Sequence, residues 1–263
     1  MIYPIPYISE GTLDFPCLPA YNSSLPRHKG TNMKIAIISD LHGELPKVPA
    51  CDLLLIAGDI TPATREYHRQ HYRTAYWFDT VFRWWLETIK TRKTVMIAGN
   101  HDFIFQDHRN MLPNDLPLTY LEDQHFEWEG LKIWGTPWQP IFYDWAFNLS
   151  EEELDRKFSA IPDGIDILVS HGPPLGYCDL TFDQRSVGSY SLLKHVERTR
   201  PNLVACGHIH YSYGSMEMLH KEPDARTLVV NASVLGEDYK LQNKPIVVDT
   251  DGWKVLEQGK MEK

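Results

Sequence analysis

Nine residues with metal-binding or acid–base side chains closely follow five short apolar runs of this sequence. The runs span residues 35–39, 53–57, 94–98, 165–170 and 203–206. The residues that follow them are Asp40, His42, Asp59, Asn100, His101, Asp102, His171, His208 and His210. Short runs of this kind, rich in β-branched residues and bounded by glycine or polar residues, predict buried strands. We therefore expect one site at the common end of five strands.

The donors in this group are carboxylate and amide oxygens and imidazole nitrogens, without cysteine sulfur. Such a set suits hard or borderline divalent ions, namely Mn²⁺, Fe²⁺, Zn²⁺ or Mg²⁺. Gly99 permits a sharp turn after the run 94–98, so that Asn100, His101 and Asp102 project together beyond the sheet edge. The motif therefore predicts a metal centre with acid–base groups beside it.

The elements that position these residues follow from hydrophobic periodicity. Apolar residues recur at spacings of three and four over 76–89, which predicts an amphipathic helix between the strands 53–57 and 94–98. We expect its aromatic side chains to pack on the sheet and not to form a surface for base stacking. A β-α-β order implies a right-handed crossover and parallel strands, which brings Asp59 and Asn100 within reach of each other.

Further along, residues 125–134 predict a hairpin that turns at Gly130. Ser150 followed by glutamates predicts a capped helix start. A second helix is expected over 189–198, with His195 as a structural or surface residue. Three alternating segments near the end predict strands of a second sheet, at 227–230, 245–248 and 253–256.

The loop 135–145 is dense in aromatic residues and proline. Such side chains are costly to expose without a role. Two interpretations stay open, a packed structural cap or a wall of the substrate pocket.

At 263 residues, the chain fits one large α/β domain, which we place at 33–263. Residues 1–32 are rich in Pro, Tyr, Ser and Gly and lack periodicity, so we expect an irregular extension without a secretory signal. Met33 could be an alternative start. The competing hypothesis is that aromatic residues of the extension, Tyr3, Tyr7, Phe15 and Tyr21, pack over the core or the site.

The formal net charge of -9 argues against broad, non-specific binding to nucleic acid. It allows a small phosphorylated ligand, because two divalent cations would add about four positive charges locally. No stretch reaches the roughly 20 apolar residues that span a bilayer, so no membrane insertion is expected. The four cysteines are scattered and predict free core thiols in a reducing, cytoplasmic setting.

The ordered motifs Asp-x-His, Gly-Asp, Gly-Asn-His-Asp, His-Gly and Gly-His-x-His resemble those of the calcineurin-like metallophosphoesterases, from Met33 to the C-terminus. Two further segments are similar to the metallophosphoesterase-domain-containing branch, which is related to class III cyclic-nucleotide phosphodiesterases. They are Ser-His-Gly-Pro-Pro-Leu-Gly-Tyr at 170–177 and Val-Asn-Ala-Ser at 230–233. The resemblance implies a four-layer α-β-β-α sandwich with a dimetal site at the C-terminal ends of its strands.

The resemblance also implies roles for single residues. Asp40, His42, Asp59 and His210 would hold one metal ion. Asp59, Asn100, His171 and His208 would hold the other, so that Asp59 bridges the pair. His101 would donate a proton to the leaving oxygen, and Asp102 would orient its imidazole. Two Mn²⁺ ions are the first choice for this centre, with Fe, Zn or Mg as alternatives.

The implied activity is hydrolysis of small phosphodiesters, with 3′,5′- or 2′,3′-cyclic nucleotides as expected substrates and a metal-bridging hydroxide as nucleophile. Three aromatic residues, Trp138, Phe142 and Tyr177, are candidates for stacking on a nucleobase. The alternatives are a phosphomonoesterase or protein phosphatase, a nuclease, and a nucleotide-binding or scaffolding protein of low activity. No feature of the sequence determines an oligomeric state.

Overall fold

The apolar runs form buried strands in a computed structural model that describes residues 32–64, 67, 70–221 and 225–261. Residues 1–31 of the expected extension 1–32, with its two competing hypotheses and with Cys17, lie outside the described ranges. Within the described ranges, no helix is both long and apolar enough to cross a membrane.

The first sheet has six strands in the order β14-β13-β1-β2-β3-β4. Their bounds, in chain order, are β1 Lys34–Ile38, β2 Cys51–Ala57, β3 Thr91–Ile97, β4 Thr119–Tyr120, β13 Ile246–Asp249 and β14 Lys254–Glu257. Strands β1 to β4 run parallel, and β13 and β14 extend the sheet antiparallel beside β1. The parallel part places the C-terminal ends of β1, β2 and β3 at one edge.

The second sheet also has six strands, in the order β11-β12-β10-β9-β6-β5. Their bounds are β5 Gln124–Trp128, β6 Leu131–Thr136, β9 Ile167–Ser170, β10 Leu203–Cys206, β11 Gly214–Leu219 and β12 Arg226–Asn231. Strands β6, β9, β10 and β12 are parallel, while β5 and β11 are antiparallel edges. A two-stranded sheet joins β7 Gln139–Pro140 to β8 Asn148–Leu149.

The three strands predicted near the C-terminus were all expected in the second sheet, and this expectation is wrong for two of them. Only β12 belongs to that sheet, whereas β13 and β14 complete the first sheet through the antiparallel pairing of β13 with β1. Alternating apolar residues predict a strand that buries one face, but they do not encode which strand it pairs with.

The helical segments are short and lie outside the two large sheets. Their bounds are α2 His71–Trp77, the π-helical turn η1 Phe78–Phe82, α3 Arg83–Thr88, α4 Phe103–Asp107, η2 Arg109–Met111, α5 Glu151–Phe158, α6 Tyr190–Thr199 and η3 His210–Ser212. The helix predicted over 76–89 corresponds to α2, η1 and α3 in succession. The π turn inserts one wide turn that the 3.6-residue pattern does not reveal.

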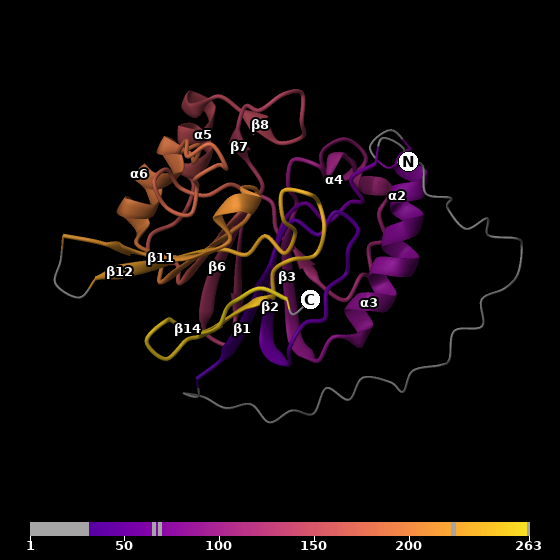
Figure 1. The fold of residues 1–263 in the computed structure, drawn as a ribbon, viewed down its shortest axis with the longest axis horizontal. Coiled ribbons are helices and arrows are strands. Elements are labelled where there is room, and N and C mark those ends of the chain that lie inside the picture. Colours follow the sequence, from indigo (N-terminus) through magenta and orange to yellow (C-terminus); the bar gives the residue numbers. More distant parts are fainter. Residues whose placement is uncertain (1–31, 65–66, 68–69, 222–224, 262–263) are drawn as a thin grey trace, which may run out of the picture.

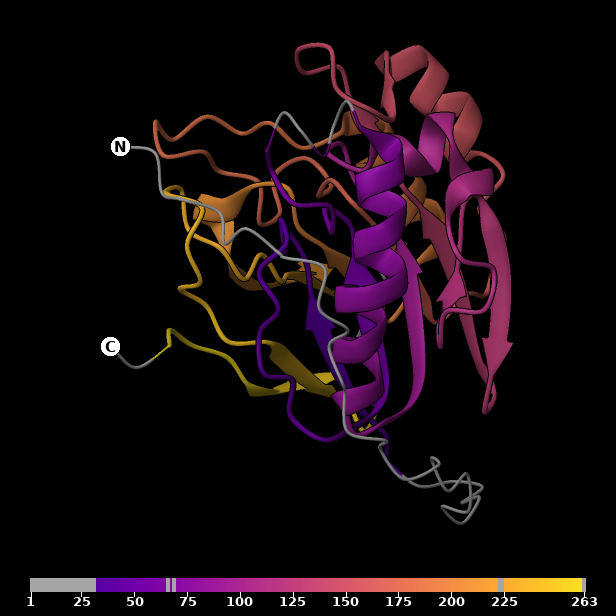
Figure 2. The same cartoon turned by 90° about the vertical axis from the view of Figure 1, so that its right-hand side faces the viewer.

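Four layers result, as the family resemblance implied: helices α2 and α3 cover one sheet and helices α5 and α6 cover the other (Figure 1). The view turned by 90° shows α2 and α3 lying lengthwise along their sheet (Figure 2). Side chains of β1 alternate between two cores, with Ala36 and Ile38 facing the helices and Ile35 and Ile37 facing the second sheet. A third core lies between the second sheet and α5 and α6.

The predicted turns and caps are confirmed. Glu129 and Gly130 both have positive φ between β5 and β6, the geometry of a tight two-residue hairpin turn. Ser150 forms a capping box with Glu153 at the start of α5. His195 is buried on α6 and bonds the carboxylate of Asp155 on α5 at 2.9 Å, so it is structural.

Candidate metal centre

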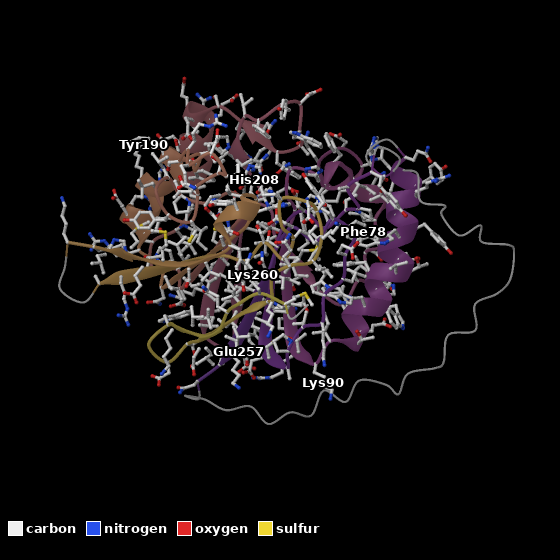
Figure 3. All side chains as sticks on the ribbon, in the orientation of Figure 1. Phe78, Lys90, Tyr190, His208, Glu257 and Lys260 are labelled. Atoms are coloured by element: carbon white, nitrogen blue, oxygen red, sulfur yellow. The ribbon has the colours of Figure 1, made fainter. Side chains whose placement is uncertain are left out.

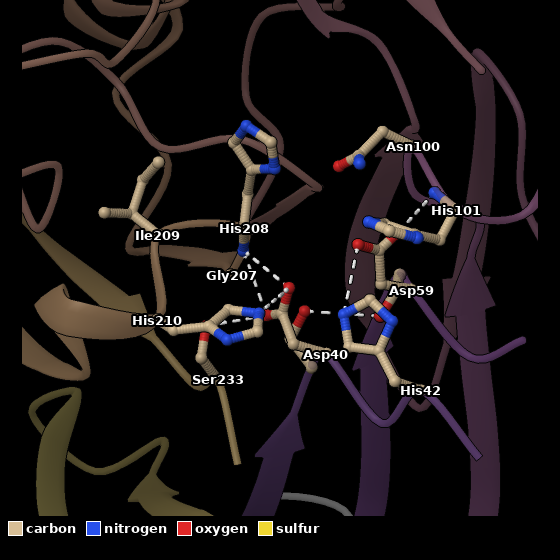
Figure 4. Close-up of polar contacts among 12 residues, drawn as sticks. Asp40, His42, Asp59, Asn100, His101, Gly207, His208, Ile209, His210 and Ser233 are labelled. Carbon is tan, nitrogen blue, oxygen red and sulfur yellow. Dashed lines mark hydrogen bonds and ion pairs between the residues drawn. The ribbon is translucent and has the colours of Figure 1, made fainter. Parts of the chain in front are cut away.

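The predicted ligands converge where the C-terminal ends of the two sheets meet. Asp40 and His42 follow β1, Asp59 follows β2, and Asn100 follows β3, all in the first sheet. The second sheet contributes His171 after β9, and His208 and His210 after β10. Figure 4 shows most of these side chains turned toward one another, and Figure 3 places His208 between the layers.

Left-handed backbone conformations bring these side chains inward. Asp40, His42, Asp59 and His208 have φ values of 56°, 44°, 57° and 67°. Residues with a Cβ adopt this region at a cost of roughly 1–2 kcal/mol each. The chain leaves each strand through a sharp turn, and strain of this kind is typical of functional sites.

Asp59 lies at the middle of the group. Its Oδ2 is 3.6 Å from Nε2 of His42 and 3.5 Å from Nε2 of His171. Its Oδ1 accepts a hydrogen bond of 2.7 Å from the backbone N–H of His101. One carboxylate therefore contacts imidazoles from both sheets and fixes the turn that carries His101.

Asp40 links the two sheets on the other side of the group. Its Oδ1 is 3.4 Å from Nε2 of His210, and its Oδ2 accepts hydrogen bonds from the backbone N–H of His208 at 2.9 Å and from Oγ of Ser233 at 2.6 Å. All these partners come from the second half of the chain. The carboxylate thereby holds the His208 turn against the end of β1.

Backbone carbonyls fix the tautomers of two of the histidines. Nδ1 of His171 donates to the carbonyl of Ala57 at 2.9 Å, and Nδ1 of His210 donates to the carbonyl of Gly236 at 3.1 Å. A carbonyl can only accept, so each Nε2 is left facing the centre. Carbonyl partners of this type orient metal-binding histidines in proteins.

The charges of the group are strongly coupled. Burial lowers the pKa of His42 to about 4 and that of His208 to about 3, so both rings are neutral at pH 7. Burial also opposes the charged form of His171 and His210, but Asp59 and Asp40 outweigh it and raise both pKa values to about 9. In return, the pKa of Asp59 falls well below its usual value.

This donor set fits divalent metal ions. Both ring nitrogens of His42 are buried without a hydrogen-bond partner among the described residues, although the ring lies beside Asp59. Groups of three donors have ligand atoms within 4.8 Å of one another: Asp40, His42 and His210; His42, Asp59 and His101; and Asp40, Asp59 and His171. Neutral imidazoles and ionised carboxylates are the forms that bind such ions. His42 and His208 are already neutral, whereas His171 and His210 would each release a proton when an ion binds.

The carboxylate of Asp102 is held by backbone groups, and its expected role in orienting His101 stays a prediction. Its buried carboxylate accepts hydrogen bonds of 2.8 to 3.2 Å from the backbone N–H groups of Ile60, Thr61 and Gly99. Burial raises the pKa of this carboxyl to about 6. Asp102 therefore fastens the loops after β2 and β3 together.

A cavity of about 420 Å³ opens beside the candidate ligands. Its lining includes His208 and His210, together with Pro140, Ile141, Phe142, Thr181, Arg185, Val187, Ile209, Glu237 and Tyr239. Of the three aromatic residues predicted to bind substrate, only Phe142 lies in this lining. The 135–145 loop thus supplies part of the wall through Pro140, Ile141 and Phe142.

Trp138 and Tyr177 are placed elsewhere. The indole Nε1 of Trp138 donates to Asp123 at 2.9 Å, its ring packs on Phe147 at 5.2 Å, and the ammonium group of Lys157 lies over it. Tyr177 packs against the core under α5 and α6. Each side chain has a structural environment, and neither belongs to the lining of the cavity.

Three residues at the site were not predicted. The ring of Trp145 lies 4.1 Å from that of His101, Tyr239 packs among the histidines, and Ser233 bonds Asp40. Ser233 belonged to the motif at 230–233 and Trp145 to the aromatic loop 135–145, which the sequence analysis singled out without giving either residue a role. Tyr239 occupies a loop without periodicity, so no pattern pointed to it.

Gly207→Ala is expected to lower both stability and metal content. A Cβ at position 207 would overlap Oγ of Ser39 and Oδ2 of Asp40, while Asn231 holds the Gly207 carbonyl in place at 3.2 Å. We expect a loss of about 1–3 kcal/mol in unfolding free energy, and less than half of the wild-type metal content. Thermal unfolding and metal analysis measure the two effects.

Gly130→Ala is the control for that substitution. Gly130 has φ +83°, and no atom lies within 4 Å of the Cβ that the substitution would add. It precedes β6, at the opposite end of that strand from Thr136. Backbone strain should therefore lower the unfolding free energy by roughly 1–2 kcal/mol without lowering metal content. Equal metal loss in both variants would contradict the explanation given for Gly207.

Comparison with known proteins agrees with this geometry. The family model described as calcineurin-like phosphoesterase matches residues 33–212. The chain is 31% identical to the human protein named metallophosphoesterase domain-containing protein 1, over 95% of this chain and 75% of that protein. It is also 31% identical to a UPF0046 protein of Caenorhabditis elegans, over 84% of this chain and 61% of that protein.

The fold is likewise found among solved structures. One crystal structure aligns with a TM-score of 0.56 at 16% sequence identity, covering 88% of this chain and 100% of the other. That likeness concerns the fold alone. Together, the family model and the relatives show that the chain belongs to the calcineurin-like metallophosphoesterase family.

Proposed function

We propose that this metal-dependent phosphoesterase is a phosphodiesterase that acts on cyclic nucleotides or similar small phosphodiesters. The observation that carries the proposal is the position of Asp59, whose carboxylate lies 3.5–3.6 Å from imidazoles of both sheets, beside a cavity large enough for an organic substituent. The family uses a dinuclear centre, and candidate ligands for two ions meet here.

In this proposal, Asp40, His42, Asp59 and His210 hold one ion, and Asp59, Asn100, His171 and His208 hold the other. Two bound divalent ions would supply a nucleophilic water at neutral pH and neutralise charge on the phosphoryl oxygens. The protein fixes the donors beforehand. The carbonyls of Ala57 and Gly236 set the tautomers of His171 and His210, and the hydrogen bond from the N–H of His101 to Asp59 places the acid–base residue beside the bridging carboxylate.

The cavity supports a diester more than a monoester. A diester carries two organic groups, one of which leaves while the other must be accommodated. The cavity beside His208 and His210 is lined by Ile141, Phe142 and Val187, which suits an apolar or aromatic substituent. Phe142 is 54% exposed and so has a free face for a nucleobase.

The test is turnover by metal-stripped protein reloaded with Mn²⁺, Fe²⁺, Zn²⁺ or Mg²⁺. Bis-p-nitrophenyl phosphate, p-nitrophenyl phosphate and a panel of 2′,3′- and 3′,5′-cyclic nucleotides are compared side by side. We expect the highest rates with Mn²⁺ and a preference for diesters. A preference for the monoester would instead identify a phosphomonoesterase, and no turnover with two ions bound would identify a binding protein.

Metal loading also has a thermodynamic readout. Binding to the folded state alone stabilises it by about 2.7 kcal/mol when the free ion is at 100 times its dissociation constant. We therefore expect the unfolding temperature to rise with Mn²⁺ and to fall again with a chelator.

We also propose a cytoplasmic location, because Cys51, Cys178 and Cys206 are free thiols.

A further inference from the structure

Tyr239 stands at the boundary between the candidate ligands and the cavity. Its ring centroid is 4.9 Å from that of His42, 5.2 Å from that of His210 and 6.5 Å from that of His101. The same side chain lines the cavity together with His208 and His210. A substrate phosphate at the centre, with its substituent in the cavity, would therefore lie beside this phenol.

The loop that carries Tyr239 is held in one conformation. Tyr239 has φ +56°, a left-handed conformation that it shares with four of the candidate ligands. The loop is closed by backbone hydrogen bonds from Tyr239 to Gly236 at 2.9 Å and from Gly236 to Lys240 at 3.0 Å. Asp238 accepts from the side chain of Gln242 at 2.8 Å across it.

The same loop is tied to the metal centre. The carbonyl of Gly236, which accepts the N–H of Tyr239, also accepts Nδ1–H of His210. The position of the phenol is therefore coupled to the orientation of a candidate ligand. Strain that is maintained in this way points to a role beyond packing.

The hydroxyl of Tyr239 has no hydrogen bond to any described residue, and the side chain is 47% exposed. A phenolic hydroxyl can donate a hydrogen bond to an anion. A tyrosine with such surroundings differs from Tyr213, whose hydroxyl bonds Lys244 and Gly259.

We propose that Tyr239 is a further catalytic residue, whose hydroxyl donates a hydrogen bond to a non-bridging oxygen of the bound phosphoryl group. The inference rests on the proposed function. His101 and Tyr239, with ring centroids 6.5 Å apart, would contact one phosphoryl group through different oxygens. A donor aimed at these oxygens strengthens its interaction as negative charge builds on them in the transition state.

Tyr239→Phe tests this assignment, because it removes the hydroxyl and keeps the ring that packs on His42 and His210. We expect kcat for bis-p-nitrophenyl phosphate to fall about 10- to 100-fold, the range for a hydrogen bond to a charged group. Affinity of the Mn²⁺-loaded protein for inorganic phosphate, measured by calorimetry, should fall about tenfold. Metal content and unfolding temperature should not change.

Tyr211→Phe is the matched control. Tyr211 is also 47% exposed and follows His210 directly, but its hydroxyl accepts from Gln184 and does not line the cavity. It should bind phosphate as the wild type does. Wild-type phosphate affinity in Tyr239→Phe, loss of metal from it, or an equal loss in Tyr211→Phe would each overturn the assignment.

The phosphate isotherm keeps this test separate from that of the proposed function. If no ester were hydrolysed, the proposed phosphodiesterase activity would fail, yet weaker phosphate binding in Tyr239→Phe would still support the contact. If diesters were hydrolysed and Tyr239→Phe behaved as wild type in both measurements, only the role of Tyr239 would be wrong.

Discussion

Replacing Asp59 with alanine will abolish most metal binding and lower diester turnover by about three orders of magnitude or more, which corresponds to ~4 kcal/mol of transition-state stabilisation. The reason is its place in the site. Its carboxylate contacts His42 at 3.6 Å and His171 at 3.5 Å, and it also anchors the backbone of His101. In the proposed ligand sets Asp59 belongs to both ions, so its removal would weaken the binding of each ion.

Asp40→Ala is the comparison that makes this prediction specific. Asp40 belongs to only one of the two proposed ligand sets, and its other partners are His208, His210 and Ser233. We expect Asp40→Ala to retain about one ion per chain and Asp59→Ala to retain fewer, as measured by atomic emission after gel filtration. An Asp59→Ala protein with two ions and the wild-type rate would disprove the bridging assignment.

Much of the fold was predictable because its core strands are parallel and buried on both faces. Such strands read as continuous apolar runs, and the first three of these runs correspond to β1, β2 and β3. Parallel strands end at the same edge, so the side chains after them had to meet. The convergence of Asp59 and Asn100 followed from that argument, and the capping box at Ser150 followed from local chemistry.

The pairing of the C-terminal strands was not predictable in the same way. Strand β13 is as apolar as β12, yet one lies beside β1 and the other beside β10. The choice depends on contacts between residues about 200 positions apart, such as Lys34 with Asp249. A local hydrophobic pattern determines which face of a strand is buried, but it does not determine which strand it pairs with.

The surroundings of loop residues were likewise not predictable from the sequence. Trp138 was a candidate for base stacking, but its indole N–H donates a hydrogen bond to Asp123 and its ring packs against Phe147. Tyr239 was overlooked because a left-handed turn leaves no periodic trace in the sequence. Loops carry function through their individual geometry, which composition does not specify.

His101→Ala is expected to keep both ions and to lose rate. General acid catalysis contributes about 10²- to 10⁴-fold, and the loss should be largest for esters with poor leaving groups. The imidazole lies 4.5 Å from the ring of His42 and packs on Trp145 at 4.1 Å. Initial rates on aryl phosphodiesters of increasing leaving-group pKa, combined with metal analysis, measure the effect.

The geometry also allows a competing role for His101 as a metal ligand, and the His101→Ala variant distinguishes the two roles. His101 has a ring nitrogen within 4.8 Å of ligand atoms of His42 and Asp59, close enough to count as a third ligand. If it were one, His101→Ala would lose metal together with rate, and the loss would not depend on the leaving group. His125→Ala, at an exposed position of β5, should match wild type in both measurements. Full metal content with a steeper dependence on leaving-group pKa would assign His101 to proton donation, because only a donor to the departing oxygen matters more as that oxygen becomes more basic.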